Sequence, residues 1–140
     1  MTAQNDKSLR PRPQLLQDIE TLAKLLDESQ KWFPHRYKYG YGNRLQNFVS
    51  DMIECYHFSQ THTDFNRRAD VLQRLLIKLD SVYSLLEIIA SLGGFPDDKL
   101  NQIYRLMDGI AKQTKGLKAY FAARSNSALN YPPPPSNKAL

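Results

Sequence analysis

The chain has 140 residues, a formal net charge of +5 at neutral pH and a single cysteine, Cys55. This length fits one domain. One cysteine excludes an intrachain disulfide and a cysteine-based zinc site, and no apolar run approaches the roughly 20 residues that span a bilayer. The positive charge favours anionic partners, nucleic acid first, and the single thiol is typical of a protein in the reducing cytoplasm.

The first predicted helix runs from about Pro13 to Trp32, because leucine and isoleucine recur there at three- and four-residue steps. Proline is tolerated in the first helical turn, so Pro13 is compatible with its start. Pro34 ends it, since proline disfavours helical geometry in the residue before it. Residues 1–12 are expected to form a flexible basic arm, and residues 33–42 a connection.

Two further helices are predicted over about Gly42–Ser59 and Phe65–Leu92. Thr63 or Asp64 is a candidate cap for the second of these, because both side chains accept hydrogen bonds from free helical N–H groups. The glycine pair at 93–94 ends it, since glycine readily adopts the left-handed cap conformation. The side chains expected to face inward from this helix are Val71, Leu72, Leu75, Leu76, Leu79, Val82, Tyr83, Leu86, Ile89 and Ala90.

The fourth predicted helix begins near Pro96 and ends at about Phe121. Residues 122–140 are expected to form a flexible, proline-rich tail, with the Tyr-Pro-Pro-Pro-Pro stretch as extended polyproline. Four amphipathic helices with short links predict an all-α fold, an antiparallel up-down-up-down four-helix bundle over residues 13–121.

Basic residues gather in three stretches of the sequence. The stretches 31–50 and 112–124 contain no acidic residue, and the third lies near the start of the third helix. An antiparallel bundle would place them in two patches, one at each end or along adjacent edges. A solvated polar face with charge complementation at helix ends would give the same pattern. The candidate contacts to nucleic acid or a protein partner are Arg36, Lys38, Arg44, Arg67, Arg68, Arg74, Lys78, Lys112, Lys115, Lys118 and Arg124.

Tyrosines alternate with these cations in the first connection, at Tyr37, Tyr39 and Tyr41. Aromatic rings beside cations can stack on exposed bases. The interpretation we favour is that Tyr39 and Tyr41 pack under the connection together with Phe33, because tyrosines usually serve as half-buried anchors.

Glu54 and His57 have the Glu-x-x-His spacing of half a di-iron site. A complete site needs a second copy, but Ala90 stands three residues after Glu87. Cys55 lies near histidines without any sign of an oxyanion hole, and the sequence has no phosphate-binding loop. We therefore expect no metal, no cofactor and no catalytic residue: a binding protein and not an enzyme.

Several short motifs follow one another in a particular order. They are Phe33-Pro34, Tyr39-Gly40-Tyr41-Gly42-Asn43-Arg44-Leu45, Arg68-Ala69-Asp70, Leu75-Leu76-Ile77-Lys78-Leu79-Asp80, Leu92-Gly93-Gly94-Phe95 and Met107-Asp108-Gly109-Ile110-Ala111-Lys112. In this order and spacing they resemble the accessory variability determinant (Avd) proteins of diversity-generating retroelements, over about residues 14–121. Those proteins are related to bundle proteins encoded within ribosomal RNA intervening sequences. That branch carries an Ile-Pro-x-Asn-Ile-Ala-Glu-Gly-like stretch where residues 48–55 here read Phe-Val-Ser-Asp-Met-Ile-Glu-Cys, which favours the retroelement branch.

The resemblance implies a four-helix fold and a non-catalytic partner of a reverse transcriptase. Members of the family form a ring-like homopentamer with a basic surface, bind the reverse transcriptase and RNA or DNA, and support mutagenic copying of template RNA into cDNA. Two alternatives are a ribosome- or RNA-associated bundle of the intervening-sequence type and a structural adaptor that binds only protein. The third helix is apolar on several sides between Ser81 and Leu92, which makes it the candidate edge between protomers.

Overall fold

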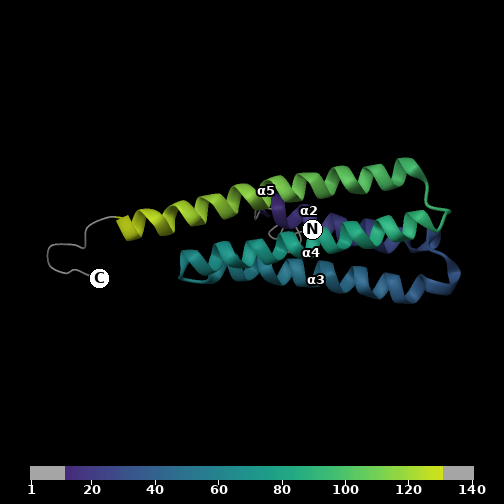
Figure 1. Ribbon diagram of the computed structural model, residues 1–140, viewed down its shortest axis with the longest axis horizontal. Coiled ribbons are helices and arrows are strands. Elements are labelled where there is room, and N and C mark those ends of the chain that lie inside the picture. Colours follow the sequence, from purple (N-terminus) through teal and green to yellow (C-terminus); the bar gives the residue numbers. More distant parts are fainter. Residues whose placement is uncertain (1–11, 131–140) are drawn as a thin grey trace, which may run out of the picture.

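The computed structural model describes residues 12–130, and within them it contains four long helices and no strand. The helices run antiparallel to their sequence neighbours, and α5 continues past the turn between α3 and α4 (Figure 1). Contacts join α2 to α3, α3 to α4, α4 to α5 and α5 back to α2, so the helices close into a ring. The predicted all-α four-helix bundle is confirmed. The elements are α2 (Gln14–Ser29), η1 (Gln30–Trp32), η2 (His35–Tyr37), α3 (Lys38–Thr61), α4 (Phe65–Ser91) and α5 (Asp97–Asn130).

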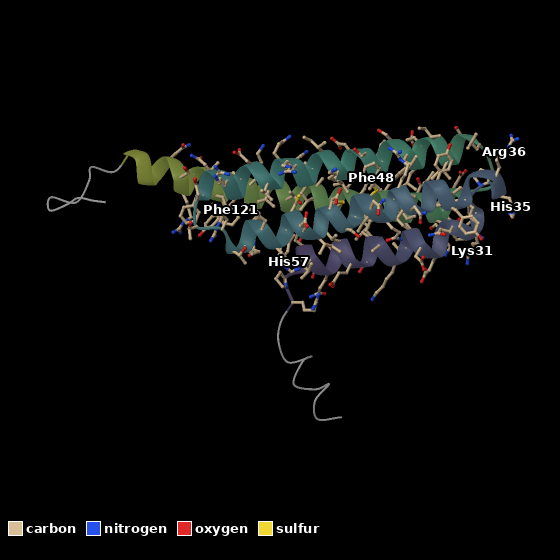
Figure 2. All side chains as sticks on the ribbon, turned by 90° about the horizontal axis from the view of Figure 1, so that it is seen from below. Lys31, His35, Arg36, Phe48, His57 and Phe121 are labelled. Carbon is tan, nitrogen blue, oxygen red and sulfur yellow. The ribbon has the colours of Figure 1, made fainter. Side chains whose placement is uncertain are left out.

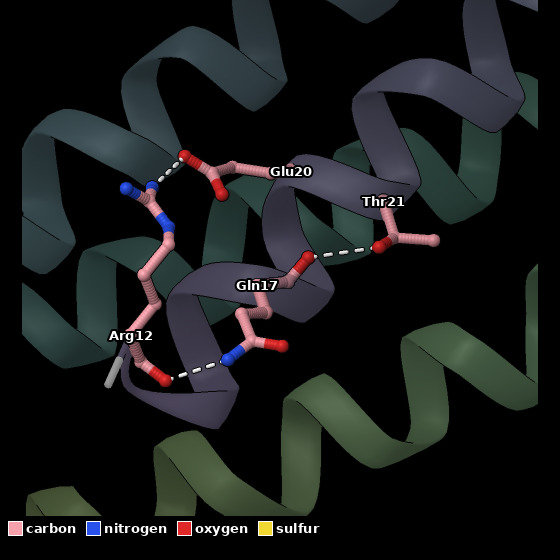
Figure 3. Close-up of polar contacts among 4 residues, drawn as sticks. All are labelled: Arg12, Gln17, Glu20 and Thr21. Atoms are coloured by element: carbon pink, nitrogen blue, oxygen red, sulfur yellow. Dashed lines mark hydrogen bonds and ion pairs between the residues drawn. The ribbon is translucent and has the colours of Figure 1, made fainter. Parts of the chain in front are cut away.

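The start of α2 is held by side chains from within its first two turns. Pro13 precedes the helix and supplies no side-chain cap. The Gln17 amide donates to the backbone carbonyl of Arg12 at 2.6 Å, and the Arg12 guanidinium forms an ion pair with Glu20 (Figure 3). These contacts tie the residue that precedes Pro13 to the first two turns of the helix.

Pro34 lies in the connection between α2 and α3, as predicted, and one short 3-10 turn lies on each side of it. The helix α3 then begins at Lys38, four residues before its predicted start at Gly42. Gly42 is buried against the end of α2, where an added Cβ would lie 2.9 Å from Gln30 Cδ. The crowding atoms are the far end of the flexible Gln30 side chain, so a larger residue here would displace that side chain.

Capping residues mark both ends of α4. The Asp64 carboxylate accepts a hydrogen bond from the Asn66 amide at 2.9 Å, so Asp64 is the N-cap. At the other end, Gly93 and Gly94 have φ angles of 91° and 92°, which only glycine adopts readily. These two residues turn the chain from α4 into α5.

The helix α5 extends to Asn130, nine residues past its predicted end at Phe121. Residues 122–130, predicted to belong to the flexible tail, are therefore helical. They contain no proline or glycine, and Phe121 and Ser125 are both buried, so packing continues along this face. The proline block and residues 1–11 of the predicted N-terminal arm (residues 1–12) lie outside the described residues.

One core runs along the inner faces of all four helices. Tyr83, expected among the inward residues, is instead half-exposed and packs against Tyr104 with the rings tilted and their centroids 4.7 Å apart. The Tyr104 hydroxyl donates to Glu87, and burial together with this hydrogen bond raises the pKa of Tyr104. The fully buried side chains include Ile19, Leu22, Leu26, Leu45, Met52, Leu72, Leu75, Leu86, Ile89, Ile103 and Ile110.

None of the helices within residues 12–130 has the length and apolar composition needed to cross a membrane.

Candidate nucleic-acid interface

An arginine–aromatic cluster lies where α4 begins, formed by Phe65, Arg68, Tyr120, Phe121 and Arg124. The guanidinium carbon of Arg68 is 5.1 Å from the Phe65 ring and 5.2 Å from the Phe121 ring. The guanidinium of Arg124 lies 4.8 Å from the Phe65 ring and donates to the Tyr120 hydroxyl at 3.0 Å. Arg68 and Arg124, which stand in different basic stretches of the sequence, thus lie in one cluster. Their contacts with the aromatic rings attach the C-terminal part of α5 to α4.

A second pair of cations meets over Phe48, in the middle of the bundle (Figure 2). Arg44 lies 6.0 Å from the centre of this ring and Lys78 lies 5.8 Å from it. The Lys78 ammonium also forms an ion pair with Asp51 at 3.1 Å. The charge of Lys78 is therefore partly satisfied inside the protein, whereas the Arg44 side chain remains exposed.

Arg67 and Arg74 line a recess between α3 and α4, which we name the α3–α4 recess. It has a volume of about 610 Å³. Both arginines are exposed, and neither forms an ion pair with another residue of the described chain. The other residues lining the recess are Glu54, Cys55, Phe58, Asp70 and Val71.

The C-terminal half of α5 is strongly basic. Between Gly109 and Asn130 it contains four cations and no acidic residue, and we name this segment the basic half of α5. Lys112 and Lys115 are exposed and form no ion pair within residues 12–130. Lys118 reaches α4 instead, where its ammonium donates to the Gln73 side chain at 2.6 Å. Each three-residue step turns the helix by about 300°, so the three lysines form an oblique row.

The remaining predicted cations, Arg36 and Lys38, lie in η2 and at the start of α3. Figure 2 shows Arg36 beside His35 at the end of the bundle opposite Phe121. The structure therefore separates these cations from the arginine–aromatic cluster by the length of the bundle.

The two tyrosines predicted to pack under the first connection differ. Tyr41 is half-buried and packs against the core, in agreement with the prediction. Tyr39 is 78 % exposed, so the prediction is wrong for this residue. The core position beneath the connection is filled by Phe33, which is buried and lies 6.3 Å from the Phe95 ring. The side chain of Tyr37 lies outside the part of the chain that the structure describes.

The half-motif Glu54-x-x-His57 lies on the outside of α3. His57 is exposed and its ring meets Tyr56 edge-on at 5.5 Å. Across residues 12–130, no three His, Cys, Asp or Glu side chains gather closely enough to hold a metal ion.

Burial raises the pKa of the half-buried Cys55 thiol, and the nearby charge of Arg74 acts in the opposite direction. We expect iodoacetamide to alkylate Cys55 more slowly in the folded protein at pH 8 than in the urea-unfolded chain, because the thiolate is the reactive form. The alkylation rate should keep rising above pH 9. Mass spectrometry of timed samples measures both rates. Equal rates in the folded and unfolded protein would contradict this expectation.

Comparison with models of known protein families and with curated proteins finds no match for this chain.

Proposed function

We propose that this protein is a non-catalytic, nucleic-acid-binding accessory subunit that partners the reverse transcriptase of a diversity-generating retroelement in the cytoplasm. The basic half of α5 carries the nucleic-acid part of the proposal, because its lysines stand on a rigid helix with no acid beside them in the sequence. The reverse-transcriptase partner and the mutagenic copying of template RNA into cDNA rest on the resemblance to the Avd proteins.

Binding of this kind is electrostatic. Exposed lysines such as Lys112 and Lys115 contact phosphates as point charges and release condensed counterions from the nucleic acid. Such contacts position a strand without reading its sequence. The accessory subunit would hold template RNA or nascent cDNA, while the reverse transcriptase makes every covalent bond.

Self-association is part of the proposal and is supported by the outer face of α4. Ile77 and Ile88 are large hydrophobic residues of α4 that are about half-exposed, and they lie on the same side of the helix because 11 residues make about three turns. Apolar side chains gathered on one helix mark surfaces that another protein covers. We propose that copies of this chain meet there, as a homopentamer by the resemblance.

The test is a fluorescence titration of RNA, DNA and hybrid duplexes at low and moderate salt, with the double variant Lys112→Glu/Lys115→Glu beside the parent protein. We expect the variant to lose at least about tenfold in affinity, and the slope of log K against log salt to fall by about 2, one unit for each phosphate contact.

The matched control is Lys24→Glu/Lys99→Glu, which makes the same change in net charge at exposed lysines on α2 and at the start of α5. An equal loss in the control would show that only net charge matters and not the basic half of α5. If the parent protein binds no nucleic acid even at low salt, the proposal is wrong. The exposed face of α4 would then favour an adaptor that binds only protein.

A further inference from the structure

The α3–α4 recess is a hollow whose volume of about 610 Å³ falls within the usual range of small-molecule sites. Cys55 and Val71 give it apolar walls, and the Phe58 ring, 39 % exposed, forms an aromatic surface beside them. It lies toward the end of the bundle where α3 ends and α4 begins. Basic residues of α4 come together there with an exposed ring of α3.

The orientation of Phe58 is fixed by its neighbours. Its ring stacks on the His62 ring, with centroids 4.8 Å apart and an angle of 23° between the planes. The His62 ring is held in turn, because its Nδ1 accepts a hydrogen bond from the Asp64 amide at 3.0 Å. One face of Phe58 is thus occupied by histidine, and a ring held in this way loses little entropy when a ligand stacks on it.

The charges that line the recess are balanced. Arg67 and Arg74 bring two positive charges, and Glu54 and Asp70 bring two negative ones. No ion pair joins them, although all four line one hollow on the described surface. A bare polyanion gains little from such a site, since the carboxylates repel it. A fitting ligand brings anionic groups, hydrogen-bond donors and a flat apolar face together.

We propose that the α3–α4 recess binds one unpaired nucleotide of a single-stranded RNA or DNA. The base stacks on Phe58, the adjoining phosphates contact Arg67 and Arg74, and an amino group of the base donates to Glu54 or Asp70. A base inside a duplex is stacked and paired on both sides, so the recess distinguishes unpaired from paired nucleic acid. This inference rests on the proposed function and adds to it a preference for single strands.

A protein side chain is the competing occupant. Protein-binding hot spots are desolvated pockets depleted of charge at their centre. Here four charged side chains surround a small apolar area, which suits a nucleotide better.

The test measures binding of a labelled single strand of about 12 nucleotides and of the blunt duplex of the same sequence to the full chain. We expect Phe58→Leu to weaken single-strand binding about tenfold and to leave duplex binding unchanged, because stacking on an aromatic ring supplies that much affinity. Tyr83→Leu is the matched control, since Tyr83 is an exposed aromatic residue of α4 that does not line the recess. Arg67→Gln/Arg74→Gln should weaken single-strand binding similarly. Circular dichroism melting confirms that each variant is folded.

Alkylation of Cys55 gives a second readout in the unmodified protein. A saturating single strand should slow the reaction of iodoacetamide with this thiol, because Cys55 lines the recess, whereas the duplex should not. If neither strand nor duplex binds at all, the proposed function fails and this inference with it. If both bind but Phe58→Leu matches the parent protein, or the single strand leaves Cys55 unprotected, only this inference is overturned, and a protein side chain becomes the expected occupant.

Discussion

Replacing Phe121 with Ala is expected to lower the free energy of unfolding by about 3 kcal/mol, the usual cost of truncating a buried phenylalanine. Phe121 is only 5 % exposed, and its ring stacks on Phe65 with centroids 6.1 Å apart. Arg68 lies over the same pair of rings. The substitution removes the ring that contacts both Phe65 and Arg68 and leaves a cavity between α4 and α5. Urea denaturation followed by circular dichroism measures the loss.

The neighbouring residue supplies the control. Tyr120 is 53 % exposed, so Tyr120→Ala should cost less than about 1 kcal/mol. Phe121→Ala should also speed hydrogen exchange at the amides of residues 122–130, because that part of α5 depends on the cluster for its attachment. Unchanged exchange in this segment of the Phe121→Ala protein would show that the cluster does not hold the end of α5.

The end of α5 also shows why a helix boundary is difficult to read from sequence. The four consecutive prolines draw attention to an extended segment, and the prediction therefore stops the helix at Phe121. Yet nothing between Ala122 and Asn130 breaks a helix, and the packing of Phe121 against Phe65, which is 56 positions away, is invisible in the local sequence. Tertiary contact decides this boundary and local propensity does not.

At the start of α3 the predicted helix is again too short. Gly40 and Gly42 indicate a loop by their intrinsic preference, since glycine weakens helices. The structure places both inside α3, where Gly42 is buried against the Gln30 side chain of the preceding segment, so tertiary packing outweighs the weak helix preference of glycine. The number and order of the helices could be predicted from apolar periodicity, Pro34 and Gly93, all of which are local signals.

The grouping of the basic residues could not be predicted in the same way. Arg68 and Arg124 stand in different stretches of the sequence and meet only because the start of α4 lies beside the end of α5. The α3–α4 recess likewise depends on the register between two helices, which a single sequence does not specify. The signal available in the sequence was Phe58, four positions before His62, and such a pair is also compatible with ordinary packing.

Truncation of Ile110 tests whether stability and nucleic-acid binding are separate properties of α5. Ile110 is fully buried in the core, so Ile110→Ala should lower the free energy of unfolding by about 3 kcal/mol, from lost burial and the cavity it leaves. Lys112 stands two positions on, about 200° around the helix, so it faces away from the site of the change. A domain of this size commonly has a stability of about 5–15 kcal/mol, so the variant should remain folded at low temperature.

The control is Gln102→Ala, at an exposed position of α5, where truncation should cost less than about 1 kcal/mol. Urea denaturation compares the two variants with the parent protein, and a titration at about 10 °C measures their affinity for nucleic acid. Ile110→Ala should bind like the parent protein, because charge on the outer face carries the binding and the core carries the fold. A large loss of affinity in a folded Ile110→Ala protein would mean that binding depends on the packing of α5 and not only on its lysines.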